Sequence, residues 1–244
     1  MREIGRREFT AGALAGLGIL LPKPAAPYVI TRSRQLPAYR YRKNVYCLTA
    51  YSPEIRAYKK AIEVMRARPA TDGTSWQAQA NIHGAFRPNP PAGIVNACPP
   101  ATSADMVAPP GMIADVCRHD GFFLAWHRMY LHYFERIVRA ASGDPAFALP
   151  YWGYSPGGQR DLPAVFRSPA STANALWTDQ RVAAINAGSN LNASAVDASG
   201  AMGNLAYNAF QSSLNGTPHG VVHVSVGGGC GWMSYFETAG MDPI

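Results

Sequence analysis

Residues 121–141 carry the strongest helical pattern in this chain of 244 residues. Large apolar residues recur there at three- and four-residue spacing, which places them on one face of a helix. They are Phe123, Trp126, Tyr130, Phe134, Ile137 and Val138. We expect Asp120 to cap the start of this helix and Gly143-Asp144-Pro145 to end it. A helix with so broad an apolar face must pack against other elements, so this segment constrains the fold more than any other.

Other helices are predicted on both sides of this one, and no β-alternation of useful length competes with them. In residues 51–68, Ser52 is placed to cap a helix and Pro53 fits its first turn. Shorter helices are expected from Ser75 to about Asn81, from about Asn204 to Leu214, and around His219 to Val224. Residues 85–115 and 150–200 are rich in loop-forming residues. The predicted fold class is therefore mainly α, as one domain with long irregular loops.

The formal net charge of +7 belongs to the N-terminal end of the chain. Residues 27–43 contain five basic residues and no acidic one, whereas residues 44–244 contain 13 residues of each sign. No aromatic platform, recognition helix or finger pattern accompanies the basic stretch, so we do not expect nucleic-acid binding. We interpret residues 27–44 as a solvated basic lead-in to a domain at residues 45–244.

Residues 1–26 have the pattern of an export signal. Arg6-Arg7 precedes an uncharged run from Ala11 to Leu21, which is too short to cross a bilayer of about 30 Å as a helix. Paired arginines before an apolar run are typical of a twin-arginine signal. We therefore expect export to the periplasm or secretion, without a stable membrane span. The alternative is a frayed, Gly/Ala-rich tail.

Two of the six histidines, His219 and His223, are four residues apart. On a helix this spacing puts both imidazoles on one face, where they could bind one metal ion. No Glu follows His219, so the pair is not the zinc-protease pattern. Taken alone, such a pair is also a common feature of helix surfaces.

The other four histidines lie between residues 83 and 132. His127 is on the apolar side of the 121–141 helix, His119 directly precedes that helix, and His83 follows the expected short helix. His132 is about 140° around the helix from His127, so we expect it to point away as a surface or packing histidine. A buried core histidine is the alternative for His127. Three histidines in one half and two in the other suggest a paired metal site, for which imidazole ligands favour copper or zinc.

Three segments resemble the copper-binding motifs of one family. The sequence CRHDGFFLAWHRMYL (residues 117–131) resembles the first copper motif of the tyrosinase and catechol oxidase family of type-3 dicopper proteins. The sequence TPHGVVHVSVGG (217–228) resembles the start of the second motif, and residues 75–84 resemble the segment that carries the first ligand. The resemblance spans residues 45–244. It implies a helical bundle of the tyrosinase dicopper type with two copper ions, each bound by three histidines.

Carried over residue by residue, the resemblance implies the ligand set. For the first copper ion it is His83, His119 and His127, and for the second His219 and His223. The implied reaction is oxidation of o-diphenols to o-quinones by O₂, with prior hydroxylation of monophenols in some members. The expected partners are therefore a small phenolic substrate and O₂.

The residues around the first motif add further expectations. Phe122, Phe123 and Trp126 are expected to form aromatic walls that exclude water. Cys117 matches family members in which this cysteine forms a thioether to the nearby histidine, here His119. A buried free thiol is the alternative. The other cysteines, Cys47, Cys98 and Cys230, cannot be paired from the sequence.

The sequence also departs from the family pattern. The spacing from His119 to His127 is eight residues, one fewer than is usual in the family. Gly220 and Asn215 replace groups proposed to help deprotonate monophenols, which favours diphenol oxidation over hydroxylation. No histidine follows His223 before Ile244.

Because of this last departure, we expect a sequence cut short before the helix that carries the last copper ligand. Such a chain would bind copper poorly and oxidise catechol little or not at all. The competing hypotheses are a hemocyanin-like O₂-binding module and a catalytically inactive, exported copper-binding or interaction protein. No pattern in the sequence identifies the phenol, the signal cleavage site or the oligomeric state.

Overall fold

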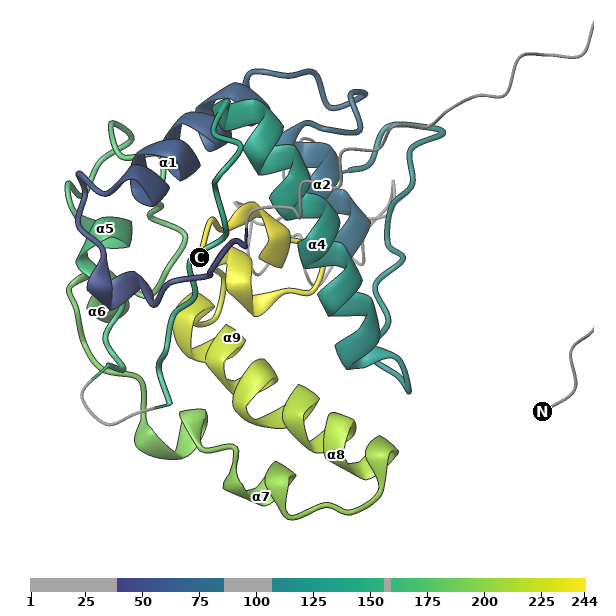
Figure 1. Cartoon of the computed structure of the whole chain (residues 1–244). Coiled ribbons are helices and arrows are strands. Elements are labelled where there is room, and N and C mark those ends of the chain that lie inside the picture. Colours follow the sequence, from purple (N-terminus) through teal and green to yellow (C-terminus); the bar gives the residue numbers. More distant parts are fainter. Residues whose placement is uncertain (1–38, 86–106, 156–158) are drawn as a thin grey trace, which may run out of the picture. The chain divides into compact units, whose positions relative to one another are not determined.

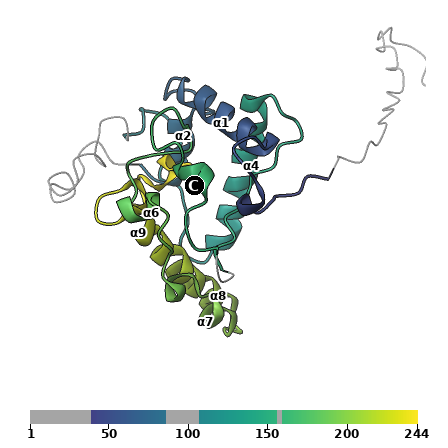
Figure 2. The same ribbon diagram turned by 90° about the vertical axis from the view of Figure 1, so that its left-hand side faces the viewer.

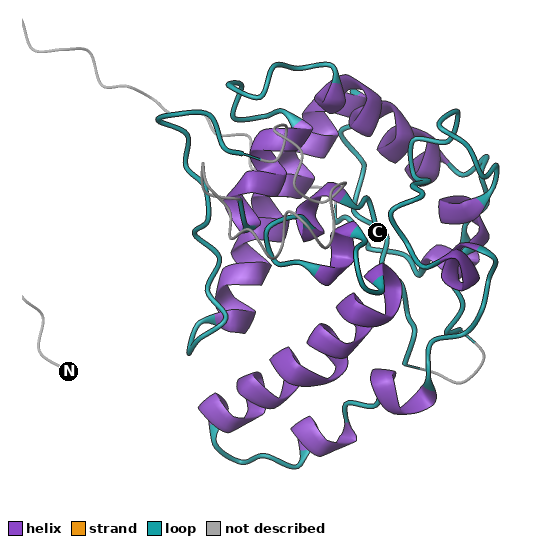
Figure 3. Ribbon diagram, turned by 180° about the vertical axis from the view of Figure 1, so that it is seen from behind, coloured by secondary structure: helices purple, strands orange, loops and turns teal. Residues whose placement is uncertain are grey.

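The computed structural model describes residues 39–85, 107–155 and 159–244 (Figure 1). The predicted export signal, residues 27–38 of the basic lead-in and most of the 85–115 loop lie outside these residues. Over the described ranges the chain is helical (Figure 3), and β-pairing is limited to isolated bridges, among them Asn44–Tyr151 and Asp161–Asn190. The predicted mainly α fold class is therefore confirmed. Among these residues, no helix combines the length and the apolar character that a membrane crossing requires.

Two long helices and several shorter ones make up this part of the chain. In chain order they are α1 (Pro53–Arg66), α2 (Trp76–His83), α4 (Phe123–Ser142), α5 (Ala164–Arg167), α6 (Ala183–Asn186), α7 (Ser199–Met202), α8 (Tyr207–Leu214) and α9 (Val221–Gly227). Helix α1 packs against α4, and α2 lies next to α1 (Figures 1 and 2). Helices α5 to α7 are single turns, so the prediction of irregular structure across 150–200 holds apart from these turns.

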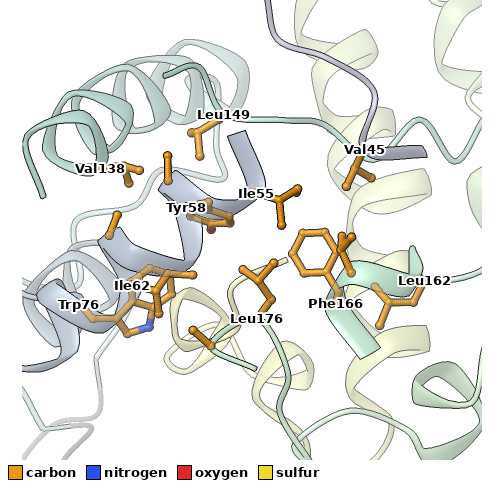
Figure 4. Close-up of a cluster of buried hydrophobic side chains, with 14 of the residues drawn as sticks. Val45, Ile55, Tyr58, Ile62, Trp76, Val138, Leu149, Leu162, Phe166 and Leu176 are labelled. Atoms are coloured by element: carbon orange, nitrogen blue, oxygen red, sulfur yellow. The ribbon is translucent and has the colours of Figure 1, made fainter. Parts of the chain in front are cut away.

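The hydrophobic core lies between α1, the C-terminal part of α4 and the loop residues that face them (Figure 4). The apolar residues of α1 that recur at helical spacing are all buried, namely Ile55, Tyr58, Ile62 and Met65. Their partners include Val138 of α4 and, from the loops and α5, Leu149, Phe166 and Leu176. The period read from the sequence therefore identifies the face of α1 that builds the core.

The ends of α4 agree with the prediction at one end only. Gly143 ends the helix in the left-handed conformation (φ 74°), and its N–H donates to the Arg139 carbonyl. At the start, however, the predicted Asp120 cap is wrong, because Phe122 occupies the N-cap position without a side-chain hydrogen bond. Asp120 lies ahead of the helix in a turn, and its backbone carbonyl accepts the Phe123 N–H at 3.0 Å.

The two predicted C-terminal helices are present as α8 and α9, joined by a wide π-type turn at Asn215–Gly220. Pro218 has no N–H to donate, and Thr217 leaves the helical backbone (φ −134°, ψ 124°). A regular α-helical hydrogen-bond ladder cannot pass through these two residues. His219 therefore lies in the wide turn and His223 in α9, rather than both in one regular helix.

The last residues of the chain are anchored across α1 and α2. The Tyr58 hydroxyl donates to the Pro243 carbonyl at 2.9 Å, and Trp76 Nε1 donates to the Met241 carbonyl at 3.1 Å. Asp242 forms an ion pair with Arg181, and both side chains are fully buried. These contacts fix the backbone of residues 239–244 beside α2, the helix that ends at His83.

Candidate metal centre

Five of the six histidines lie together, and they are the five predicted as ligands. They come from the end of α2 (His83), the turn before α4 (His119), α4 itself (His127), the π-type turn (His219) and α9 (His223). The sixth, His132, is exposed on α4 and contacts the ring of Tyr133. The structure thus agrees with the prediction that His132 points away from the others.

The first group consists of His83, His119 and His127. Their ring centroids are 5.8 Å apart for His83–His119, 5.7 Å for His83–His127 and 5.2 Å for His119–His127. One ligand atom from each histidine and the sulfur of Cys117 all lie within 4.8 Å of one another. The three side chains therefore form a triangle of the size that one metal ion could draw together.

The second group consists of His219 and His223, whose ring centroids are 4.5 Å apart. His219 also lies 5.4 Å from His119 and 5.7 Å from His127 between ring centroids. The two groups are therefore adjacent, with His219 at the boundary between them.

Backbone carbonyls hold four of the five imidazoles through Nδ1. The acceptors are the carbonyls of Phe236 for His83 (3.1 Å), Phe123 for His127 (2.7 Å), Asn215 for His219 (3.2 Å) and Met233 for His223 (3.1 Å). A carbonyl can only accept, so Nδ1 carries the proton and Nε2 keeps its lone pair. In the fifth imidazole, His119, Nε2 is buried and has no hydrogen-bond partner among the described residues. This donor set, with its orientation fixed by carbonyls, fits copper.

Burial keeps these imidazoles neutral. It lowers the pKa of His83 to about 4 and the pKa of His219 to about 3, and neighbouring imidazoles lower both further. The pKa values of His119, His127 and His223 are also lowered, mainly by burial. Metal ligation needs the neutral imidazole, so the site holds its ligands in the form that binds.

Aromatic rings surround the histidines, and two of the three predicted aromatic residues are among them. The Phe123 ring lies 4.6 Å from His127 and 4.8 Å from His219, and Trp126 lies 5.1 Å from His127. Phe122, in contrast, is 65% exposed, because it precedes the first turn of α4. The prediction that Phe122 forms a wall of the site is therefore wrong.

Phe236 takes this place, which the sequence did not predict. Its ring lies 4.9 Å from His83 and 5.2 Å from His119. The Phe236 backbone approaches Gly84 so closely that a Cβ there would lie 2.6 Å from the Phe236 carbonyl oxygen. Gly84, directly after His83, was the one sign in the sequence that another segment packs closely against this backbone. A glycine does not reveal which residue that segment contributes.

Cys117 lies with the first group. Its Sγ is 3.5 Å from Nε2 of His127, and burial raises the pKa of the thiol to about 12. The thioether to His119 stays a prediction. Cys47 is free and exposed, whereas Cys230 is disulfide-bonded.

Asn215 lies beside both groups. Its side-chain amide donates to the His119 carbonyl at 3.4 Å, while its own carbonyl accepts from His219. An amide here can orient the histidine backbone, but it cannot take up a proton as a carboxylate does.

Two cavities reach the histidines from the side of Met233 and Ile244. The larger, about 260 Å³, touches His83, His127, His219 and His223 and is walled by aromatic residues of α1, α2 and α4. The smaller, about 220 Å³, reaches His219 and His223 past Trp152 and Tyr154. A small molecule could reach the imidazoles through these apolar spaces.

Comparison with known proteins gives one consistent family. Residues 73–184 match the family model described as the common central domain of tyrosinase. Tyrosinase HcTyr1 from Hahella sp. (strain CCB-MM4) is 32% identical over 240 residues, covering 83% of this chain and 49% of that protein. The (+)-larreatricin hydroxylase of Larrea tridentata is 36% identical over 117 residues, which are 48% of this chain and 18% of that protein. The chain thus spans about half or less of the length of the curated relatives described here.

Solved structures share the fold. The polyphenol oxidase of Grenache grape (Vitis vinifera) superposes with a TM-score of 0.57 and 22% identity, covering 93% of this chain and 74% of that one. Latent aurone synthase, a polyphenol oxidase, gives a TM-score of 0.62 at 21% identity, covering 84% of this chain and 45% of that one. At these identities the comparison establishes the all-helical fold of these enzymes.

Proposed function

The chain belongs to the tyrosinase and polyphenol oxidase family of copper oxidases, and we propose that it oxidises o-diphenols to o-quinones with O₂ when both of its copper sites are filled. That this chain binds copper poorly, and therefore oxidises catechol little, stays a prediction. The proposed ligands are His83, His119 and His127 for one copper ion and His219 and His223 for the other. Members of the family bind two copper ions, which supply the electron transfer to O₂ when bound. The reaction balances as two diphenols and one O₂ giving two quinones and two water molecules.

One observation carries the proposal. Five imidazoles from segments as distant as His83 and His223 meet in one place, and four of them present Nε2 because a backbone carbonyl holds Nδ1. The rings of Phe123 and Phe236 pack against them and limit access of water. If these buried imidazoles had only a structural role, Nε2 of His119 would be buried without a hydrogen-bond partner among the described residues, which is unfavourable. A bound metal ion would take up the lone pair of this nitrogen.

Relatives support phenols as the substrate class. The names of similar proteins include polyphenol oxidases, a larreatricin hydroxylase and an aureusidin synthase. We propose a small phenol with adjacent hydroxyl groups for this chain. Export through the twin-arginine pathway is a further proposal, which rests on residues 1–26 alone.

We predict a strong preference for diphenols over monophenols. By the family resemblance, Asn215 lies near the position of a group that helps to deprotonate monophenols, and its side-chain amide donates to the His119 carbonyl. An amide cannot take up a proton as a carboxylate does, and a positioned acid or base contributes about 10²–10⁴-fold to a rate. We therefore expect hydroxylation of tyramine at least about 100-fold slower than oxidation of dopamine. Oxygen uptake and quinone absorbance measure both rates on the copper-loaded chain. Equal rates for the two substrates would contradict the prediction.

The same experiment separates the alternatives, provided that copper per chain is measured by elemental analysis. Since the second group has two imidazoles in this chain and the first has three, we expect the second copper ion to be held less tightly. Quinone formation should follow its occupancy. Reversible O₂ binding without quinone would indicate an O₂-binding module, and stable copper without any reaction with O₂ would indicate a binding protein.

A further inference from the structure

Helix α4 carries a row of basic residues on the side that points away from the metal-binding histidines. Arg128, His132 and Arg136 are four residues apart, so they lie on one face of the helix. The two arginines are exposed, and they are about 12 Å apart along the helix axis. The guanidinium of Arg136 lies 5.7 Å from the centre of the Tyr133 ring, a contact that stabilises a cation without using its N–H donors.

A broad hollow beside this row is lined by basic side chains. It has a volume of about 710 Å³, and its polar lining consists of Arg40, His132, Arg136 and Arg139. No Asp or Glu is among the described residues that line it. Arg40 comes from the end of the basic lead-in, and its Nε donates to the Pro145 carbonyl at 2.8 Å, which holds this arginine beside the hollow. By its charge the hollow favours an anionic partner.

The acidic residues nearby do not cancel this charge. Glu135 is buried, and its carboxylate accepts from Arg139 Nη1 at 2.7 Å and from Arg42 Nε at 2.9 Å. Asp144 lies in the chain between two lining residues, and its carboxylate accepts a backbone N–H at 2.9 Å. Together with the two other arginines of the hollow, these groups make four guanidinium ions and two carboxylates, a net charge of +2.

A second hollow continues this surface toward the start of α4 and adds apolar contacts. It has a volume of about 640 Å³ and shares His132 with the first. Its lining combines Arg128 with Leu124, Met129, Tyr133 and Tyr207, of which the last three are 52%, 54% and 53% exposed. Large apolar groups exposed together are typical of a contact surface. Neither hollow shares a residue with the two cavities that reach the histidines, so a partner here leaves those cavities open.

We propose that this face of α4 docks a separate polypeptide through a segment that presents carboxylates beside apolar side chains. The carboxylates pair with the guanidinium groups, whose fork matches them, and the apolar side chains occupy the second hollow. A sugar or phosphate polymer would satisfy the charges alone, so the combined lining favours a polypeptide. The rest of this chain does not supply such a segment, since residues 1–38 contain six basic and two acidic residues and residues 86–106 contain one of each.

The test measures the binding of a short fluorescein-labelled peptide, in which glutamate and leucine alternate, to the full chain by fluorescence anisotropy. We expect a dissociation constant at or below about 100 μM, which rises as added NaCl screens the charges. An exposed ion pair is worth up to about fivefold in a binding constant, so Arg128→Gln/Arg136→Gln should weaken binding about 10-fold. Arg56→Gln/Arg118→Gln is the matched control, because it removes two exposed arginines that line neither hollow, and it should bind as the wild type does.

The composition of the probe separates the classes of partner. A peptide with serine in place of leucine keeps the charge but loses the apolar contacts, so it should bind at least about 10-fold more weakly. Equal affinity for the two peptides, or tighter binding of duplex DNA or a sulfated polysaccharide of the same charge, would overturn the inference in favour of a general polyanion surface. An equal loss in the two double variants, or no binding at about 1 mM peptide, would also overturn it. The measurement needs no metal, so its failure leaves the proposed function untouched.

Discussion

Replacing His127 with alanine should remove about one copper ion per chain and reduce catechol oxidation by at least about 10³-fold, equivalent to about 4 kcal/mol. Among the proposed ligands of the first group, His127 has the shortest hydrogen bond from its imidazole to a backbone carbonyl. It lies on α4, and its Nδ1 donates to the Phe123 carbonyl at 2.7 Å. Without it two imidazoles remain in this group, and a copper ion loses its third nitrogen ligand. Elemental analysis of the dialysed protein measures the copper, and oxygen uptake with catechol measures the activity.

His132→Ala is the matched control, because the same residue type is removed from the same helix. His132 is exposed and contacts only Tyr133 among the aromatic rings of the described residues. We expect copper content and activity within about twofold of the wild type. Far-ultraviolet circular dichroism of both variants checks that α4 is retained. If His127→Ala kept its copper and His132→Ala lost it, the assignment of the ligands would be wrong.

The sequence was most informative where local pattern and chemistry coincide. The apolar neighbours of His127 predict that this histidine faces inward, and the stripe from Ile55 to Met65 predicts the buried face of α1. In both cases helix geometry relates sequence spacing to direction in space. His219 and His223 also lie together, although the wide turn takes His219 out of the regular helix that their spacing suggested. His83 and His119 were predicted from the family resemblance and not from a local pattern.

The supporting residues could not be predicted because they act through the backbone. The carbonyls of Phe236 and Met233 orient His83 and His223, yet a carbonyl is present in every residue and leaves no pattern in a sequence. The predicted start of α4, with Asp120 as its cap, is wrong for a related reason. Asp120 is a favourable cap by residue type, but the turn that follows it delays the helix until Phe123. The position of a residue in the folded chain, and not its intrinsic helix or capping propensity, decides where such a helix begins.

Substitution of Asp242 by alanine should destabilise the protein by about 3–5 kcal/mol, since it leaves the Arg181 guanidinium buried without its counterion. Arg181 Nε and Nη2 donate to the Asp242 carboxylate at 2.8 and 2.6 Å, and neither side chain is exposed to solvent. A domain of this size has about 5–15 kcal/mol of stability, so the loss takes up much of it. Urea denaturation followed by tryptophan fluorescence measures the change. Lys43→Ala, which breaks the partly exposed pair with Glu54, should cost less than about 1 kcal/mol.

The same substitution should weaken metal binding, although Asp242 is not a proposed ligand. Residues 239–244 are held by Arg181, Tyr58 and Trp76, and the segment just before them supplies the carbonyls that orient His83 and His223. Loosening this segment frees both imidazoles to rotate, so we expect copper affinity to fall about 10–100-fold in the fraction that remains folded. The double variant Arg181→Met/Asp242→Leu removes both charges and should recover most of the stability. If the double variant recovered stability but not copper affinity, the ion pair would position the metal centre in addition to stabilising the fold. Unchanged copper affinity in Asp242→Ala would refute the link between this segment and the histidines.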